Sequence, residues 1–186
     1  MADTLEIDKA LPVEELYTSL VKQIKSLLSK EDNPISNLSN LTAALKQTFE
    51  KISWVGFYLF DGKRLYLGPF QGKIACTVID LGKGVCGYAA SRQETVIVPD
   101  VNKFPGHIFC DADSKSEIVV PVIKDGALYG VLDLDSASYN SFNDTDKKHL
   151  EEICRFLGEE IVVETGDVET GDVKTGDVET WRRMPH

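Results

Sequence analysis

Two Asp-Gly pairs limit what this chain can fold into. Asp61-Gly62 and Asp125-Gly126 each stand between two runs of apolar, aromatic and β-branched residues, which favour strands. Asp-Gly supplies the positive φ angles that a tight hairpin turn requires. We therefore predict two antiparallel hairpins. Their four strands cover "WVGFYLF" (54–60), "RLYLGPF" (64–70), "EIVVPVI" (117–123) and "LYGVLDLDS" (128–136).

Helical periodicity precedes the first hairpin. Apolar residues recur every three or four positions over residues 13–28 and again over 38–49, which predicts two amphipathic helices. Ser36 or Asn37 is the candidate N-cap of the second helix, because a short polar side chain there can accept a hydrogen bond from the first turn.

The segment between the hairpins is mixed. Residues 74–80 and 95–100 are predicted to form two short strands, and the glycine-rich segment 82–92 is predicted to be a loop that enters a short helix. Residues 100–116 form a long predicted loop. A loop of that length in a compact domain is usually functional or disordered.

A third long helix is predicted to close the domain. It covers residues 142–163, with Asn143 or Asp144 as its candidate cap. The predicted order of elements indicates an α+β domain, with a central antiparallel β-sheet flanked by helices. This order is two helices, three strands, a short helix, three strands and a final helix. We assign this domain to residues 1–163.

A five-residue repeat follows the closing helix. It reads "ETGDVETGDVKTGDVETWRRMPH", and a unit of five residues is too short to be a packed solenoid repeat. Its regular glycines and charges indicate a chain that cannot bury a core. Residues 164–186 are therefore predicted to be a disordered tail.

Charge and hydropathy argue against several classes of partner. The formal net charge at pH 7 is −10, so long-range attraction to phosphate backbones or anionic lipid is not expected. No apolar run approaches the roughly 20 residues that span a bilayer, and the acidic start "MADTLEIDKA" is unlike a signal peptide. We expect a cytosolic protein that binds neither nucleic acid nor membranes.

The four cysteines differ in what they indicate. Cys154 lies on the apolar face of the closing helix, where a small core side chain is expected. Cys76, Cys86 and Cys110 lack the Cys-x2-4-Cys spacing of a structural zinc site, so no metal is expected. Three thiols on two loops suit a nucleophile with resolving partners. Three unrelated structural cysteines would fit the same spacing.

Two aspartates share one face of a predicted strand. Asp133 and Asp135 are two residues apart, so their side chains point the same way while Leu132 and Leu134 point to the other face. Two like charges in one partly buried site raise the pKa of at least one carboxyl, which keeps an acid protonated at neutral pH. The solvated face of an edge strand would show the same pattern.

Two aromatic residues also share a strand face. Trp54 and Tyr58 are four residues apart on the first strand of the first hairpin. Such side chains can wall a binding site. They can equally be ordinary members of a hydrophobic core.

Four segments carry a resemblance to a known family. Together they closely resemble the free methionine-(R)-sulfoxide reductases, a GAF-domain family, and the likeness runs over about residues 13–163. The set of three cysteines with its flanks is specific to these enzymes among GAF proteins. The resemblance implies a GAF-like α+β fold. The segments are "WVGFYLF", "LGPFQGKIACTVIDLGKGVCGYAA", "GHIFCDADSKSEIVVPV" and "YGVLDLDS".

The resemblance also implies a role for each site residue. Cys110 would attack the sulfoxide, Cys76 would resolve the product, and Cys86 would assist or substitute for Cys76. Which of these two cysteines is the main resolving thiol, and which carboxylate is the acid, stays open. The implied substrate pocket consists of Trp54, Tyr58, Glu117, Asp133 and Asp135.

The implied reaction is the reduction of free L-methionine-(R)-sulfoxide to methionine without a cofactor. It would pass through a sulfenic acid and an intramolecular disulfide, which a thioredoxin-type dithiol would reduce. The resemblance further implies a homodimer. Two other classes stay open: a non-catalytic GAF module that senses a small ligand or redox state, and an interaction protein that uses the repeat tail.

Overall fold

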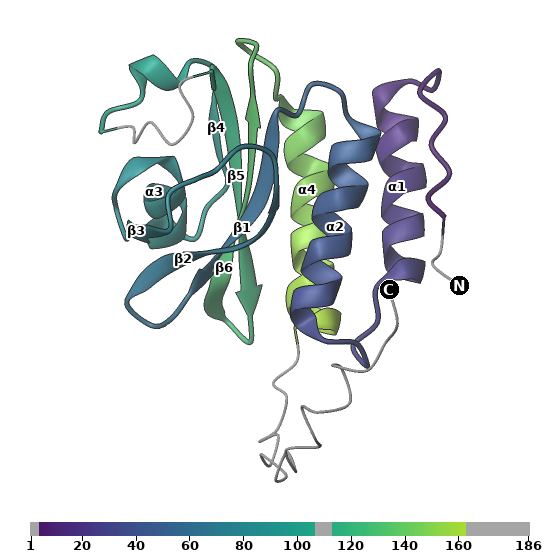
Figure 1. Cartoon of the computed structure of the whole chain (residues 1–186), viewed down its shortest axis with the longest axis horizontal. Helices are drawn as coiled ribbons and strands as arrows, with labels where there is room; N and C mark the ends of the chain where they lie inside the picture. The colour runs from purple at the N-terminus through teal and green to yellow at the C-terminus, as the bar shows by residue number, and fades with distance from the viewer. Residues whose placement is uncertain (1–3, 107–112, 163–186) are drawn as a thin grey trace, which may run out of the picture.

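A computed structural model describes residues 4–106 and 113–162 of the chain (Figure 1). Within these residues, six strands form one antiparallel sheet in the order β3-β2-β1-β6-β5-β4, which confirms the α+β class. The strands are β1 (Trp54–Phe60), β2 (Arg64–Gln71), β3 (Val78–Asp80), β4 (Val96–Val98), β5 (Ser116–Lys124) and β6 (Ala127–Ser136). The helices are α1 (Val13–Leu27), α2 (Pro34–Thr48), α3 (Gly84–Arg92), α4 (Asp144–Phe156) and the short η1 (Val101–Lys103) and η2 (Leu157–Ile161).

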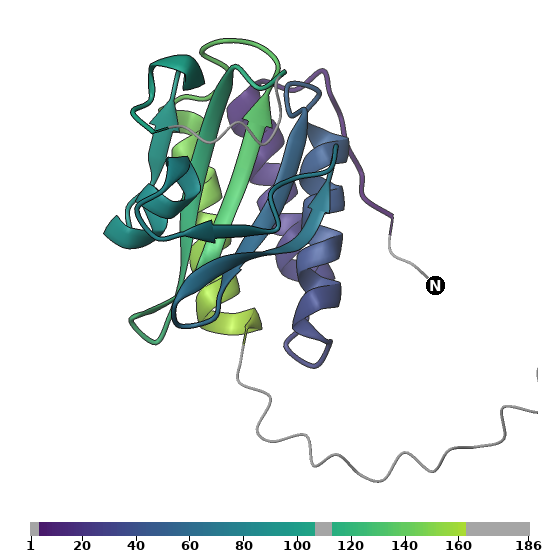
Figure 2. The same cartoon turned by 60° about the vertical axis from the view of Figure 1, so that its left-hand side comes forward.

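The helices cover the two faces of the sheet unequally. The helices α1, α2 and α4 pack together on one face, and α3 lies against the other (Figure 1, Figure 2). Alternate residues of the central strands enter the two cores: in β1, Val55 and Phe57 face the three long helices, whereas Trp54 and Tyr58 face α3. We call these sides the helix face and the α3 face. The α3 face carries the polar residues of interest.

Both Asp-Gly pairs form the predicted hairpin turns. In the β5–β6 turn, Asp125 and Gly126 have φ angles of 50° and 79°. In the β1–β2 turn, Gly62 has a φ of 94°, and the Asp61 carboxylate accepts hydrogen bonds from the backbone N–H groups two and three residues later. Different turn chemistry therefore closes the two hairpins.

The second helix begins earlier than predicted. Its N-cap is Asn33, whose side chain accepts a hydrogen bond from the Ile35 N–H at 2.8 Å, so the prediction of Ser36 or Asn37 was wrong. Pro34 explains the difference, because its fixed φ and missing N–H suit the first position of a helix.

The closing helix begins where predicted. Asn143 caps α4 in a capping box: its side chain accepts from the Thr145 N–H at 2.8 Å, and Asp146 accepts from the Asn143 N–H at 2.9 Å. The helical chain continues through η2 to Ile161. The predicted tail, residues 164–186, lies outside the described residues.

The third strand is shorter than predicted, and this moves a cysteine. Residues 74–77 do not join it, and β3 begins at Val78. The preceding chain lies beside Trp54, whose indole N–H donates to the Lys73 carbonyl at 3.0 Å, so the chain leaves the sheet there. Cys76 therefore lies in the β2–β3 loop and not at the end of a strand.

The edge strand β4 is also shorter than the predicted strand 95–100. It ends at Val98, because Pro99 has no backbone N–H with which to continue the ladder. Among the helices that the structure describes, none combines the length and the apolar character needed to cross a membrane.

Candidate active site

Three carboxylates meet on the α3 face, where β5 and β6 pair. Glu117 on β5 is the cross-strand partner of Asp135 on β6, and Asp133 lies two residues before Asp135 on the same face. Glu117 and Asp133 are each only 5% exposed, and Asp135 is partly buried. Because β6 lies inside the sheet, between β1 and β5, the edge-strand explanation of the two aspartates was wrong.

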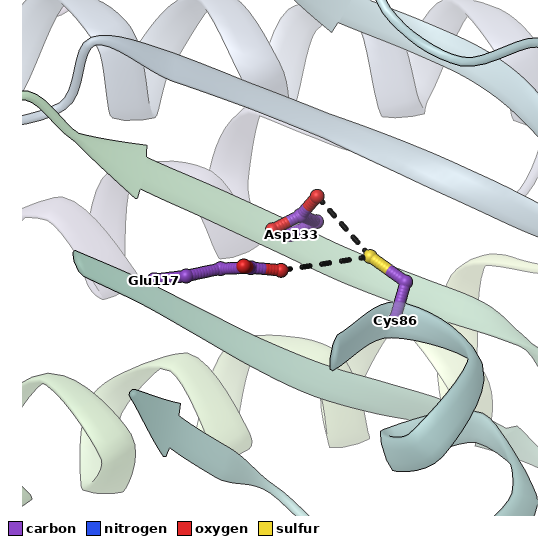
Figure 3. A group of neighbouring side chains, drawn as sticks. All are labelled: Cys86, Glu117 and Asp133. Carbon is purple, nitrogen blue, oxygen red and sulfur yellow. Dashed lines mark hydrogen bonds between the residues drawn. The ribbon is translucent and has the colours of Figure 1, made fainter. Parts of the chain in front are cut away.

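Cys86 joins this group from the first turn of α3 (Figure 3). Its thiol lies 3.2 Å from an oxygen of Asp133 and 3.9 Å from an oxygen of Glu117, and donates to these carboxyls. One donor atom from each of the three residues lies within 4.8 Å of the other two. We call Cys86, Glu117 and Asp133 the thiol–carboxylate cluster.

Two glycines allow α3 to approach the sheet so closely. Gly84 starts the helix with a φ of 60°, which favours glycine. A Cβ on Gly87 would lie 2.3 Å from the carbonyl oxygen of Asp80 in β3, so a side chain cannot fit there without movement of the backbone. The glycine-rich entry to α3 thus determines where the thiol of Cys86 lies.

Burial controls the protonation of the cluster. Desolvation raises the pKa of Glu117 well above its usual value, and the charge of Asp135 adds to the effect. Desolvation, followed by the charges of Glu117 and Asp135, likewise raises the pKa of Asp133. Desolvation, followed by the charges of Asp133 and Glu117, raises the pKa of the Cys86 thiol. At neutral pH the thiol and at least one carboxyl therefore keep their protons.

Trp54 and Tyr58 stand beside the carboxylates on β1. Trp54 is the cross-strand partner of Asp135, and its ring stacks on Tyr58 with centroids 6.1 Å apart and on Phe70 at 5.6 Å. The two predicted residues are buried, at 3% and 1% exposed. They form an aromatic wall next to the acidic groups. Phe70, on β2, was not predicted as part of it.

Two further glycines make room for the indole. A Cβ on Gly56 would lie 2.4 Å from Cη2 of Trp54, and one on Gly72 would lie 2.5 Å from its Cδ1. Gly56 is also the cross-strand partner of Asp133. A glycine inside an apolar strand indicates a close approach, and this signal in "WVGFYLF" was available in the sequence.

Cys76 and Cys154 are the other cysteines that the structure describes. Cys76, in the β2–β3 loop, is partly buried, packs against the α3-face core and is disulfide-bonded. Cys110, the predicted nucleophile, lies outside the described residues. Cys86 and Cys154 are free thiols. Cys154 is 2% exposed in the helix-face core, in agreement with its predicted role as a small core residue.

Two polar contacts involve the neighbouring loops. Lys73, in the β2–β3 loop, forms an ion pair with Asp113, which lowers the pKa of the Asp113 carboxyl. The hydroxyl of Ser114 donates a hydrogen bond to Asp135. Sequence reasoning missed Lys73 and Ser114, because single polar residues in loops carry no periodic signal.

Known proteins resemble this chain over most of its length. The GAF domain family matches residues 33–161. GAF domain-containing protein A of Dictyostelium discoideum is 54% identical, over 84% of this chain and 99% of its own. The free methionine-R-sulfoxide reductase of Saccharomyces cerevisiae is 43% identical, over 87% of this chain and 94% of its own.

A solved structure extends the likeness to three dimensions. It is the free methionine-R-sulfoxide reductase of Neisseria meningitidis in complex with its substrate, with 43% identity and a TM-score of 0.81 over 85% of this chain and 94% of that chain. The fold and these likenesses lead to one assignment. The chain belongs to the free methionine-R-sulfoxide reductases of the GAF-domain family.

Proposed function

We propose that this chain reduces free L-methionine-(R)-sulfoxide to methionine. One observation carries the proposal: three carboxylates and an aromatic wall share the α3 face, and the loop of a disulfide-bonded cysteine packs against the same core. Membership of the reductase family supports the class of reaction. The alternative is a non-catalytic sensor, and the named reductase relatives favour the enzyme over it.

The carboxylates suit the ammonium group of a free amino acid. Glu117, Asp133 and Asp135 lie together in a largely desolvated place, where negative charge is stabilised by a cation. A methionine sulfoxide inside a peptide offers only a neutral amide there. The site would then lose the attraction between its negative charge and the ammonium group, at a cost of a few kcal/mol, or roughly a hundredfold in specificity.

The same carboxyls can supply a proton to the sulfoxide oxygen. The raised pKa values of Glu117 and Asp133 keep one of them protonated at neutral pH, as a general acid requires. We assign the acid to this pair and the ammonium contact to the carboxylates that remain ionised. Trp54 and Tyr58 would hold the sulfur and its methyl group.

We assign the nucleophile to Cys110. Its thiolate attacks at the sulfoxide sulfur, and the oxygen passes from that sulfur to Sγ of Cys110 as the S–O bond of the substrate breaks and one proton is taken up. Methionine then leaves, and Cys110 is left as a sulfenic acid. The Cys76 thiol then attacks that sulfur, which releases water and forms a disulfide. A dithiol reductant restores both thiols.

The state of the described cysteines supports Cys76 as the main resolving thiol. Cys76 is disulfide-bonded, whereas Cys86 and Cys154 are free. Cys110 is the fourth cysteine of the chain, and we propose it as the partner of Cys76. Cys86 is instead held by hydrogen bonds to the carboxylates.

Three further expectations accompany this function. We propose that a thioredoxin-type protein is the physiological reductant, that the chain forms a homodimer, and that it acts in the cytosol. We also propose that the catalytic domain comprises residues 1–163. Each needs its own measurement, and the reaction itself comes first.

The test is an incubation of the purified chain with free methionine-(R)-sulfoxide and a dithiol, with methionine measured by chromatography. The matched control substrate is the N-acetylated (R)-sulfoxide, which lacks the ammonium group. We expect turnover of the free form and a kcat/KM about a hundredfold lower for the acetylated form. No methionine from the free form would favour a sensor. Equal efficiency on both would remove the carboxylates from substrate recognition.

A further inference from the structure

The thiol–carboxylate cluster has the donor atoms of a metal site. In a tetrahedral zinc site with Zn–S near ~2.3 Å and Zn–O near ~2.0 Å, a sulfur ligand and an oxygen ligand lie about 3.5 Å apart. The two distances from the Cys86 sulfur to carboxylate oxygens, 3.2 and 3.9 Å, bracket that value (Figure 3). All three residues are at most 5% exposed, so their backbone positions are held by packing.

An independent observation points to a ligand at the same place. Oδ1 of Asp133 is buried and has no hydrogen-bond partner among the residues that the structure describes. Its Oδ2 already contacts the Cys86 thiol, so the orphan oxygen belongs to the cluster itself. The Asp133 and Glu117 carboxyls also hydrogen-bond each other, which requires a retained proton, and a cation that replaced this proton would also satisfy the buried Oδ1.

The donor set indicates the kind of cation. One thiolate and two carboxylates together carry three negative charges, which a divalent ion largely neutralises. A soft sulfur ligand favours zinc, cobalt or cadmium over magnesium or calcium, which prefer oxygen alone. Three protein ligands leave a fourth tetrahedral position for water.

We propose that Cys86, Glu117 and Asp133 bind one zinc ion. Binding displaces the proton of the thiol, and that of any protonated carboxyl, to solvent, and no electrons are transferred. Zinc uses two of the carboxylates assigned above to the substrate. It therefore excludes free methionine sulfoxide and inhibits the enzyme, a consequence that rests on the proposed function.

The binding test uses the full chain in its disulfide form, in which Cys76 is not available as a thiol. Cobalt(II) is titrated in, the cobalt–thiolate charge-transfer absorption is recorded, and zinc is then added to displace the cobalt. We expect one equivalent of cobalt with a thiolate band. Cys86→Ser should abolish the band and weaken zinc binding by roughly tenfold or more.

Two variants complete the design. Cys154→Ala, the matched control, removes the other free buried thiol among the described residues and should leave the band and the affinity unchanged. Glu117→Gln keeps the thiol and the side-chain volume, and should keep the band while weakening zinc binding. Absence of a band in the unmodified chain, or a band that survives Cys86→Ser, would overturn the proposal. If Cys86→Ser does not fold, an unchanged affinity in Glu117→Gln overturns it.

Activity assays separate this proposal from the proposed function. Zinc should inhibit competitively with free methionine-(R)-sulfoxide. If zinc binds through Cys86 but does not compete with the substrate, the metal site stands and the substrate role of the carboxylates fails. If the chain has no reductase activity, the spectroscopic result still decides the metal site.

Discussion

Cys86 and Cys154 are both buried free thiols, and their surroundings separate their roles. Cys154 packs in the helix-face core, with the Val120 carbonyl 4.0 Å from its sulfur. Cys86 contacts two carboxyls. Burial is the main cause of a raised pKa in both, so little thiolate is present in either at neutral pH. Neither residue has the environment of a nucleophile.

The assigned thiol roles predict distinct kinetics for two variants. Cys110→Ser is expected to abolish methionine formation, because no other thiol takes its place. Cys76→Ser is expected to release about one methionine per chain and then to stall as the sulfenic acid, since the resolving thiol is gone. Quantifying methionine per chain with and without a thioredoxin-type reductant, in the variants and in the unmodified chain, measures both outcomes.

The control for these variants is Cys154→Ala. It should turn over like the unmodified chain, because Cys154 lies on the opposite face of the sheet from the carboxylates. Full multiple turnover by Cys110→Ser would rule out the mechanism. Repeated turnover by Cys76→Ser with a thioredoxin-type dithiol would show that Cys86 or the dithiol itself can resolve the sulfenic acid.

At the scale of elements, local chemistry made most of the secondary structure predictable. The two Asp-Gly turns and the helical periodicity depend on neighbouring residues, so the sequence reveals them directly. The pairing of β1 with β6 does not depend on neighbouring residues, because these two strands lie far apart in the chain. The central position of β6 therefore had to be observed.

The candidate site shows the same division. Spacing alone placed Asp133 and Asp135 on one strand face, and the resemblance named their partners. The contact of Cys86 with Asp133 depends on how closely α3 approaches the sheet. Local sequence patterns do not predict that distance. Ser114 reaches Asp135 from a loop, for which sequence periodicity offers no rule. Tertiary contacts decide such residues.

The close approach of α3 predicts a sharp effect of one methyl group. Alanine favours helix over glycine by roughly 1 kcal/mol, so Gly87→Ala would stabilise an unconstrained helix. Here the new Cβ would meet the Asp80 carbonyl oxygen at 2.3 Å, so α3 must shift. We expect a net loss of about 1–3 kcal/mol in the free energy of unfolding, together with reduced activity.

The matched control for Gly87→Ala is Ser91→Ala, at an exposed position of the same helix. It should change stability by less than about 0.5 kcal/mol. Urea unfolding of both variants measures the difference. Equal stability of Gly87→Ala and the unmodified chain would show that α3 does not need to lie so close to β3.

At the scale of the whole molecule, the repeat tail is expected to be dispensable for catalysis. The helix-face core is already completed by Ile161 and Val162, and the described carboxylates lie on the other face of the sheet. Truncation after Val163 should therefore leave kcat and KM unchanged within error. A loss of activity with an unchanged melting temperature would show that the tail contributes to the site.

The acidic site should also lower the stability of the whole fold in a pH-dependent way. Burial raises the pKa of Asp133 above its ordinary value of 3.8, so the native state retains a proton that the unfolded chain releases. Stability must then fall as the pH rises above about 4, because the native state binds more protons than the unfolded state.

Asp133→Asn removes this charge while keeping the shape of the side chain. We expect the variant to gain about 1 kcal/mol over the unmodified chain at pH 8, little or nothing at pH 4, and to lose reductase activity. Urea unfolding at the two pH values measures the difference. A variant that is less stable than the unmodified chain at both pH values would show that the Asp133 carboxyl stabilises the fold. The expectation that this buried carboxyl lowers stability would then be wrong.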